Sequence, residues 1–175
     1  MREIFSDREV LLEFDQKQQT ALLKEELTGQ AVVVSGIPLD GILLKLDVDK
    51  KGYKLRSSYF NSKMTFIHKG CDYCLIMPSR QAVVFFELKS DRPKGYVDQF
   101  FASKIFMDYS FRLSGYMNCC DYDYGYVYVL FCTKNNVLLT SVSKVMQKKI
   151  ENKCGKEIVV KMPGFPKGIN IDKLL

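Results

Sequence analysis

The first apolar positions of the chain are spaced as on one side of a helix. Between residues 11 and 22 they recur at intervals that fit a helical repeat. Ser6 and Glu9 have the spacing of a capping box, which predicts that a helix begins near residue 7. Gly29 offers a stop, and the polar stretch 15–19 would allow a break into two shorter helices.

After Gly29 the apolar pattern changes to that of strands, in short runs rich in β-branched and aromatic residues. Turn residues separate these runs at 49–52 and at 78–80. The strands predicted in this part of the chain are 31–34, 42–46, 53–60, 71–77 and 82–89. The run 53–60 is expected to return along 42–46 as a hairpin.

The second half of the chain alternates between helix and strand. A long helix is predicted over about 95–113, and a Tyr- and Val-rich strand over 124–133. A short helix over 143–152 and a last strand over 158–162 follow. This order predicts an α/β fold, with a sheet on which helices pack.

Length and composition set the frame for this fold. At 175 residues the chain is expected to form a single domain, 1–175, with its core over about 8–133 and a basic extension over about 144–175. No apolar run is long enough to span a membrane, and the charged start lacks the apolar block of a secretory signal. We therefore expect a cytoplasmic or nuclear protein without a membrane partner, whose six cysteines are free thiols.

Candidate chemistry is concentrated in residues 71–91. Side chains alternate along a strand, so Glu87 and Lys89 project to one face at the end of an apolar run. Asp72 opens the preceding strand, and a hairpin through 78–80 would bring Asp72 beside Glu87. Two adjacent carboxylates suit Mg²⁺, and a lysine beside the ion could serve an attacking water. The plainer alternative is a solvated Glu–Lys pair, which the motif alone favours.

This stretch resembles the PD-(D/E)xK, or restriction-endonuclease-like, nuclease superfamily, although Cys71 stands where the motif has Pro. The resemblance implies a core of helix, three strands, helix and strand, here with extra N-terminal strands, and a mixed sheet flanked by helices. It implies that Asp72 and Glu87 bind Mg²⁺ or Mn²⁺ and that Lys89 is catalytic. It adds two weaker candidates: Gln99 on the long helix, and an acid on the first helix. That acid would be Glu26 or Glu25, with Glu13 behind them.

The net charge of +6 is unevenly spread, because residues 144–175 hold eight lysines and three acids. Such a segment can bind phosphates by releasing counterions, although a solvated lysine face is the commoner outcome. The candidate nucleic-acid contacts are Lys148, Lys149, Lys153 and Lys156.

Other residue groups are weaker candidates. Cys71 and Cys74 form C-x-x-C, and Cys119 with Cys120 could complete a zinc set, but buried thiols are the better interpretation. The single histidine, His68, has no nucleophile pattern around it and is expected to be structural. Alternating tyrosines could stack bases, although packing beneath a helix is the commoner situation. These tyrosines are Tyr122, Tyr124, Tyr126 and Tyr128.

The sequence thus favours a metal-dependent nuclease that hydrolyses phosphodiester bonds, with DNA preferred over RNA as the substrate. The first alternative is a catalytically inactive module of the same fold that binds nucleic acid or a protein. A structural subunit of a larger assembly is a third and weaker hypothesis. The resemblance also makes a homodimer plausible.

Overall fold

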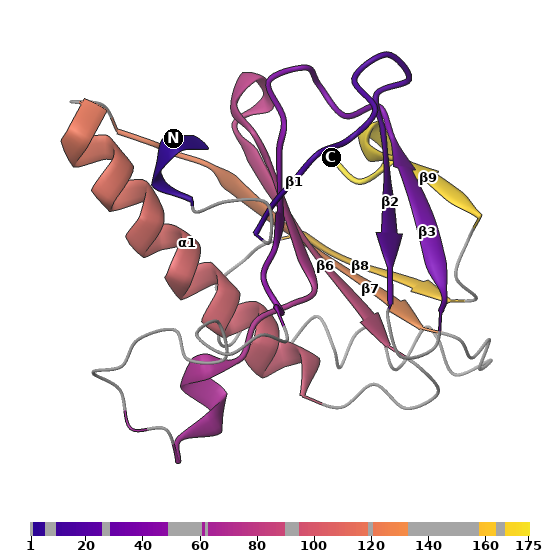
Figure 1. Ribbon diagram of the computed structural model, residues 1–175. Coiled ribbons are helices and arrows are strands. Elements are labelled where there is room, and N and C mark those ends of the chain that lie inside the picture. The colour runs from indigo at the N-terminus through magenta and orange to yellow at the C-terminus, as the bar shows by residue number, and fades with distance from the viewer. Residues whose placement is uncertain are drawn as a thin grey trace.

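The computed structural model describes residues 2–5, 10–25, 29–48, 61, 63–89, 95–118, 121–132, 158–163 and 167–175. In this part of the chain, two sheets and one long helix form three layers (Figure 1). The large mixed sheet lies in the middle, with the helix on one face and the small sheet on the other. The described residues include no helix that is both long and apolar enough to cross a membrane.

The large sheet has six strands in the order β1-β4-β5-β6-β7-β8. Its first three neighbouring pairs are antiparallel, and the pairs β6–β7 and β7–β8 are parallel. The bounds are β1 Leu11–Leu12, β4 Ile42–Lys45, β5 Tyr73–Met77, β6 Ala82–Lys89, β7 Gly125–Cys132 and β8 Ile158–Pro163.

Helix α1, Tyr96–Asn118, connects β6 to β7 and covers one face of the large sheet (Figure 1). Its buried side chains include Phe100 and Met107, which pack with Phe85 and Tyr128 of the sheet. A parallel strand pair needs a long crossover, and this helix supplies it. The helix therefore sits directly above the strand that carries the candidate Glu87.

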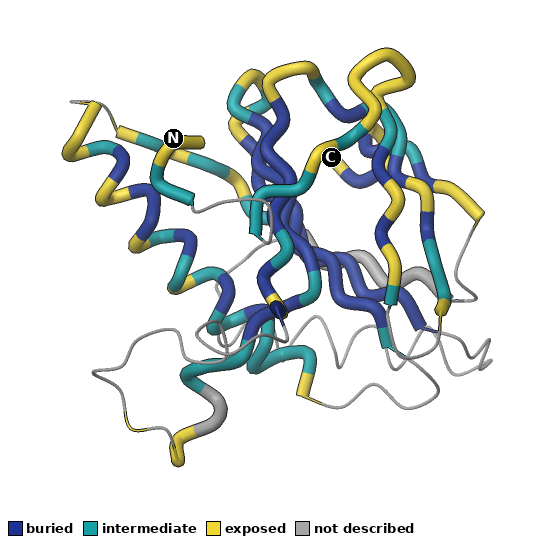
Figure 2. Tube along the Cα trace, in the orientation of Figure 1, coloured by how far each residue is buried: buried dark blue, intermediate teal, exposed yellow. Residues whose placement is uncertain are grey.

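The opposite face of the large sheet is covered by the small sheet, whose strands are β2 Thr20–Lys24, β3 Ala31–Ser35 and β9 Gly168–Asn170. Strand β3 pairs antiparallel with β2 and parallel with β9. Leu23 and Val32 pack against Leu75 and Phe86 of the large sheet. Burial on both faces makes the middle strands almost wholly apolar (Figure 2).

The prediction of an N-terminal helix is wrong. Its described residues form β1 and β2, joined by a turn in which the Asp15 Oδ1 accepts hydrogen bonds from the backbone of Lys17 and Gln18. Along β2 burial alternates, with Ala21 and Leu23 buried and Leu22 exposed. A short apolar run fits either period, and pairing with β3 selects the strand.

The other predicted elements that lie within the described residues are confirmed, with shifted ends. The long helix runs further than expected, to Asn118, and the end of the chain adds β9 and the short 3₁₀ helix η4, Ile171–Lys173. The expected hairpin return over 53–60 and the helix over 143–152 lie outside the described residues.

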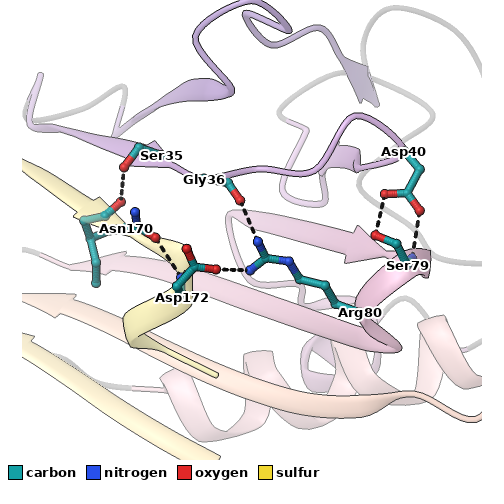
Figure 3. A network of polar contacts seen from close by, with 8 residues as sticks. Ser35, Gly36, Asp40, Ser79, Arg80, Asn170 and Asp172 are labelled. Carbon is teal, nitrogen blue, oxygen red and sulfur yellow. Dashed lines mark hydrogen bonds and ion pairs between the residues drawn. The ribbon is translucent and has the colours of Figure 1, made fainter.

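A polar network joins the two sheets at the turn between β5 and β6 (Figure 3). Arg80 of this turn forms an ion pair with Asp172 and donates to the Gly36 carbonyl at 3.3 Å. The Ser79 hydroxyl donates to Asp40 at 2.9 Å. The backbone of Gly36 is left-handed, with φ +74°, and a Cβ there would lie 2.9 Å from the Asn170 Oδ1.

Gly36→Ala is therefore expected to lower the free energy of unfolding by more than Gly29→Ala. Both positions are left-handed, but a Cβ at Gly29, with φ +70°, meets no atom within 4 Å. Gly29→Ala should lose only the cost of placing a side chain on a left-handed backbone, on the order of 1 kcal/mol. Gly36→Ala should lose this and, in addition, the cost of the steric clash with Asn170. Urea unfolding of both variants measures the difference, and equal losses would contradict the close approach to Asn170.

Candidate active site

The pairing of β5 with β6 brings Asp72 beside Glu87. Tyr73 lies opposite Phe86, so the next pair along the ladder is Asp72 and Glu87. The Asp72 backbone N–H donates to the Glu87 Oε2 at 3.2 Å, and the Leu88 N–H donates to the Asp72 Oδ2 at 2.6 Å. The predicted proximity of the two carboxylates is confirmed.

Glu87 and Lys89 share one face of β6, as the alternation predicted. Phe85 and Val83, two and four residues before Glu87, belong to the core beneath α1. The Glu87 side chain is fully buried, and its Oε1 forms an ion pair with the Lys89 ammonium group, which is 27% exposed. The pair thus joins a buried carboxylate to a cation that reaches solvent.

Burial dominates the charge state of the two acids. Burial, followed by the nearby charge of Asp72, raises the pKa of Glu87 to about 8, although Lys89 opposes this shift. Burial also raises the pKa of Asp72 to about 6. Burial lowers the pKa of Lys89, but its attraction to Glu87 outweighs that effect and leaves the pKa above the usual value. The site therefore holds a charged lysine beside two carboxyl groups that resist ionisation.

Two more carboxylates act on this site, and both raise the pKa of Asp72. Asp47 is an exposed residue just after the end of β4. The residue before it, Leu46, donates its N–H to the Asp72 carbonyl at 3.0 Å. Glu25 follows β2, and the β2 residue Lys24 exchanges hydrogen bonds with the Tyr73 hydroxyl at 3.1 and 2.7 Å. Asp47 was not predicted. Its position directly after an apolar strand was the available signal.

The remaining predicted acids are not placed in the site. Glu13 is exposed between β1 and β2, and Glu26 lies outside the described residues. The idea that one of these acids projects from a first helix is wrong, because strands occupy that part of the chain. Glu25 is the member of the set whose charge reaches Asp72.

Gln99, in the first turns of α1, contacts the chain just before Asp72. Its side-chain Nε2 donates to the Gly70 carbonyl at 3.1 Å. One turn further along, the Ser103 hydroxyl accepts a hydrogen bond from the Cys71 N–H at 2.8 Å. Both contacts fix the backbone that carries Asp72, which makes Gln99 a positioning residue in this geometry.

The described cysteine and histidine candidates do not form a metal-binding group. Cys71 and Cys74 are buried, and burial raises the pKa of both thiols, so the thiol form is favoured over the thiolate that zinc requires. Cys119 and Cys120 lie outside the described residues. Within the described part of the chain, no three His, Cys, Asp or Glu side chains form a metal-binding group. His68 ends the 3₁₀ helix η2, Thr65–His68, with its Nε2 3.4 Å from the Asn61 carbonyl oxygen.

The alternating tyrosines pack beneath α1, as the plainer interpretation predicted, and Tyr128 is fully buried. A cavity of about 910 Å³ opens between α1 and residues 121–126, away from Asp72 and Glu87. Inside it, Lys104 lies 4.4 Å from the Tyr126 ring centroid and pairs with Asp108. The predicted nucleic-acid contacts Lys148, Lys149, Lys153 and Lys156 lie outside the described residues.

Comparisons with known protein families, with curated proteins and with solved structures found no match. The chemistry available to the site follows from its own geometry. Asp72 and Glu87 offer two oxygen donor groups side by side, and Lys89 places a cation against one of them. This combination can bind a divalent cation at the carboxylates and an anionic group at the lysine.

The stability of the protein is expected to fall as the pH rises from about 6 to 8, through the ionisation of Glu87. The native state keeps the Glu87 proton up to about pH 8, whereas an unfolded glutamate loses it near 4.5. Over this window the folded state binds more protons than the unfolded state, so a single group contributes a loss of up to about 1.4 kcal/mol per pH unit. Urea unfolding at pH 6, 7 and 8 measures the slope.

Glu87→Gln should flatten this slope because the amide does not titrate. Asp123→Asn is the matched control, since Asp123 is exposed and its replacement should leave the slope unchanged. A slope that is equally steep in Glu87→Gln would show that Glu87 ionises normally in the folded protein.

Proposed function

We propose that this protein is a metal-dependent nuclease that hydrolyses phosphodiester bonds in nucleic acid, with DNA preferred over RNA. The observation that carries the proposal is the contact of Asp72, Glu87 and Lys89 at one end of the β5–β6 hairpin. A surface Glu–Lys pair would be solvated, whereas Glu87 is fully buried beside a second carboxylate. Burying a carboxylate beside a second acid is unfavourable, and acids with strongly shifted pKa values are typical of functional sites.

The order of elements around the site supports this proposal. Strands β4, β5 and β6 form an antiparallel meander, and α1 leads to β7, which is parallel to β6. This order resembles the three strands, helix and strand of the PD-(D/E)xK core. The sheet positions of Asp72, Glu87 and Lys89 agree with the D…ExK motif of that superfamily. The helix that would precede these strands has no counterpart at residues 10–25, which form strands.

The donor set at the site fits Mg²⁺ or Mn²⁺. Magnesium in proteins is commonly bound by one or two carboxylates, with water and substrate phosphate completing the shell. Asp72 and Glu87 would supply the carboxylates, and Glu25 and Asp47 add negative charge that favours a cation near Asp72. Burial raises the pKa of Asp72 and of Glu87, so a cation at this site would compete with protons for the two carboxylates. A bound divalent ion would polarise the phosphodiester and acidify a water.

The protein's own groups would divide the remaining work. Lys89 stays protonated beside Glu87 and is positioned to hold a phosphate oxygen and to stabilise the charge that develops on it. Gln99 would keep the Asp72 backbone in place through Gly70. The lysines between 148 and 156 would contact the nucleic-acid backbone, as the charge distribution predicts.

A second function is favoured by a different observation, the internal pairing of the same carboxylates. The Asp72 Oδ2 accepts the Leu88 N–H, and Glu87 is bonded by the Asp72 N–H and by Lys89. Such pairing stabilises the hairpin without any ion. The alternative is therefore a catalytically inactive module of the same architecture that binds nucleic acid or a protein without metal.

Cleavage assays test the proposed activity. Single- and double-stranded DNA and RNA are incubated with the protein in Mg²⁺, in Mn²⁺ or in EDTA, and the products are separated by gel electrophoresis. We expect cutting with metal only. Lys89→Ala should reduce the rate by a factor of at least about 100, because a group that stabilises developing charge contributes on this order. Lys17→Ala, which removes an exposed lysine on the β1–β2 turn, should cut at the wild-type rate.

Equal cutting by Lys89→Ala and by the wild-type protein would contradict the proposed role of Lys89. An absence of cutting for every substrate, combined with metal-independent binding of nucleic acid in a gel-shift assay, would establish the inactive module instead.

Metal binding is testable without a substrate. Calorimetric titration with Mn²⁺ should show binding that strengthens as the pH rises from 6 to 8, because the ion competes with protons on Asp72 and Glu87. Asp72→Asn should weaken this binding at least tenfold, whereas Asp123→Asn should not change it. Binding that is independent of pH, or unaffected by Asp72→Asn, would place the ion elsewhere.

A further inference from the structure

The outward face of α1 is strongly apolar. Five large hydrophobic side chains on this helix are between 44% and 87% exposed, and they are half of the exposed large hydrophobic residues in the described part of the chain. We call them the α1 ridge: Ile105, Tyr109, Leu113, Tyr116 and Met117. Figure 2 shows the exposed positions of α1 on the side that faces away from the sheets. Solitary exposed hydrophobic residues need no explanation, but a contiguous patch indicates an interaction surface.

The α1 ridge is continuous, because most of its members are spaced by four residues. Ile105, Tyr109, Leu113 and Met117 follow one another at i, i+4, i+8 and i+12, which is the row that packs into the grooves of a facing helix. At 100° per residue this row lies opposite the buried face that carries Phe100 and Met107. The helix thus has one apolar face for the sheet and another that the described chain does not cover.

The α1 ridge also lacks charge. Lys104 and Asp108 pair with each other on the flank of the helix, where Tyr126 donates to Asp108 and lies beneath Lys104. Arg112 borders the ridge without interrupting it. A nucleic-acid surface would need cations here, and a charged partner would need opposite charges. Depletion of charge at the centre of a patch is instead typical of protein–protein interfaces, and interfaces between identical subunits are among the more apolar ones.

We propose that the α1 ridge is the interface of a homodimer in which α1 of one copy packs against α1 of a second copy. A second copy offers the same uncharged i+4 row, so each ridge can fill the groove of the other in a two-fold contact. If a fully exposed side chain of this size offers roughly 200 Å², the ridge exposes about 600 Å² per copy. Two copies would then bury on the order of 1,200 Å², the lower limit for a specific interface.

This dimer does not depend on the proposed nuclease activity. The α1 ridge occupies the middle and C-terminal part of the helix, whereas Gln99 and Ser103, which hold the backbone before Asp72, lie nearer its start. Dimerisation is measured without nucleic acid or metal. Lys89→Ala should therefore still dimerise, and a monomeric ridge variant should keep its Mn²⁺ binding.

Sedimentation velocity of the full chain over about 1 to 100 µM, without metal or nucleic acid, tests the proposal. The wild-type protein should sediment as a dimer at the upper end of this range. Tyr109→Glu and Leu113→Asp should each shift the dissociation constant at least tenfold toward monomer, because a charge would be buried in the contact. Circular dichroism and urea unfolding should show that both variants are folded, as the ridge lies outside the core.

Leu22→Asp is the matched control, since Leu22 is an exposed leucine on β2, outside the α1 ridge. It should remain dimeric. A wild-type protein that is monomeric at 100 µM would overturn the proposal. A dimer that is unaffected by both ridge variants would overturn it as well, because the contact would then lie on another surface.

Discussion

The antiparallel pairing of β5 with β6 is the constraint on which the rest of the structure depends. The two strands form the centre of the large sheet, and both faces of the pair are buried, one beneath α1 and the other beneath the small sheet. A slip of one residue would exchange these faces. Glu87 would then enter the apolar layer of Leu75 and Val84 beneath the small sheet. The pairing that positions the site is thus enforced by the core on both sides.

Burial of the site has opposing effects on the molecule. A fully buried carboxylate beside a second acid lowers the stability of the fold at neutral pH, and Lys89 offsets only part of this cost. The neighbouring side chains are apolar, so they cannot solvate Glu87, and for the same reason they sharpen its electrostatic interaction with any cation that enters. Under the proposed function, a divalent ion would displace the proton from Glu87 and offset part of this cost.

Much of this arrangement could be predicted from the sequence, because strand alternation is a local property. Glu87 and Lys89 had to share a face, and the short turn after Met77 made the pairing of Asp72 with Glu87 the simplest arrangement. The N-terminal strands could not be predicted in this way. The apolar residues of β2 fit a helix equally well, and their alternation is enforced by pairing with β3 and by the core beneath.

Asp47 escaped prediction for a similar reason. The sequence places it after an apolar strand, but nothing local indicates that β4 pairs with β5 and so brings this end of the strand to Asp72. Acids at strand ends become informative only when the strand order is known. The lysines of the basic segment illustrate the reverse case, in which charge is visible in the sequence and its position in space is not.

The parallel pairing of β3 with β9 has a consequence for how the chain reaches this structure. Ser35 bonds to the Ile169 carbonyl across 134 positions of sequence, so this contact closes a very long loop. During synthesis, the small sheet cannot be completed until residue 170 has emerged from the ribosome, although β2 and β3 are made early. Until then the apolar face of β5 and β6 lacks part of its cover. Folding is therefore expected to be slow, and the partly made chain should depend on chaperones that hold exposed apolar surface.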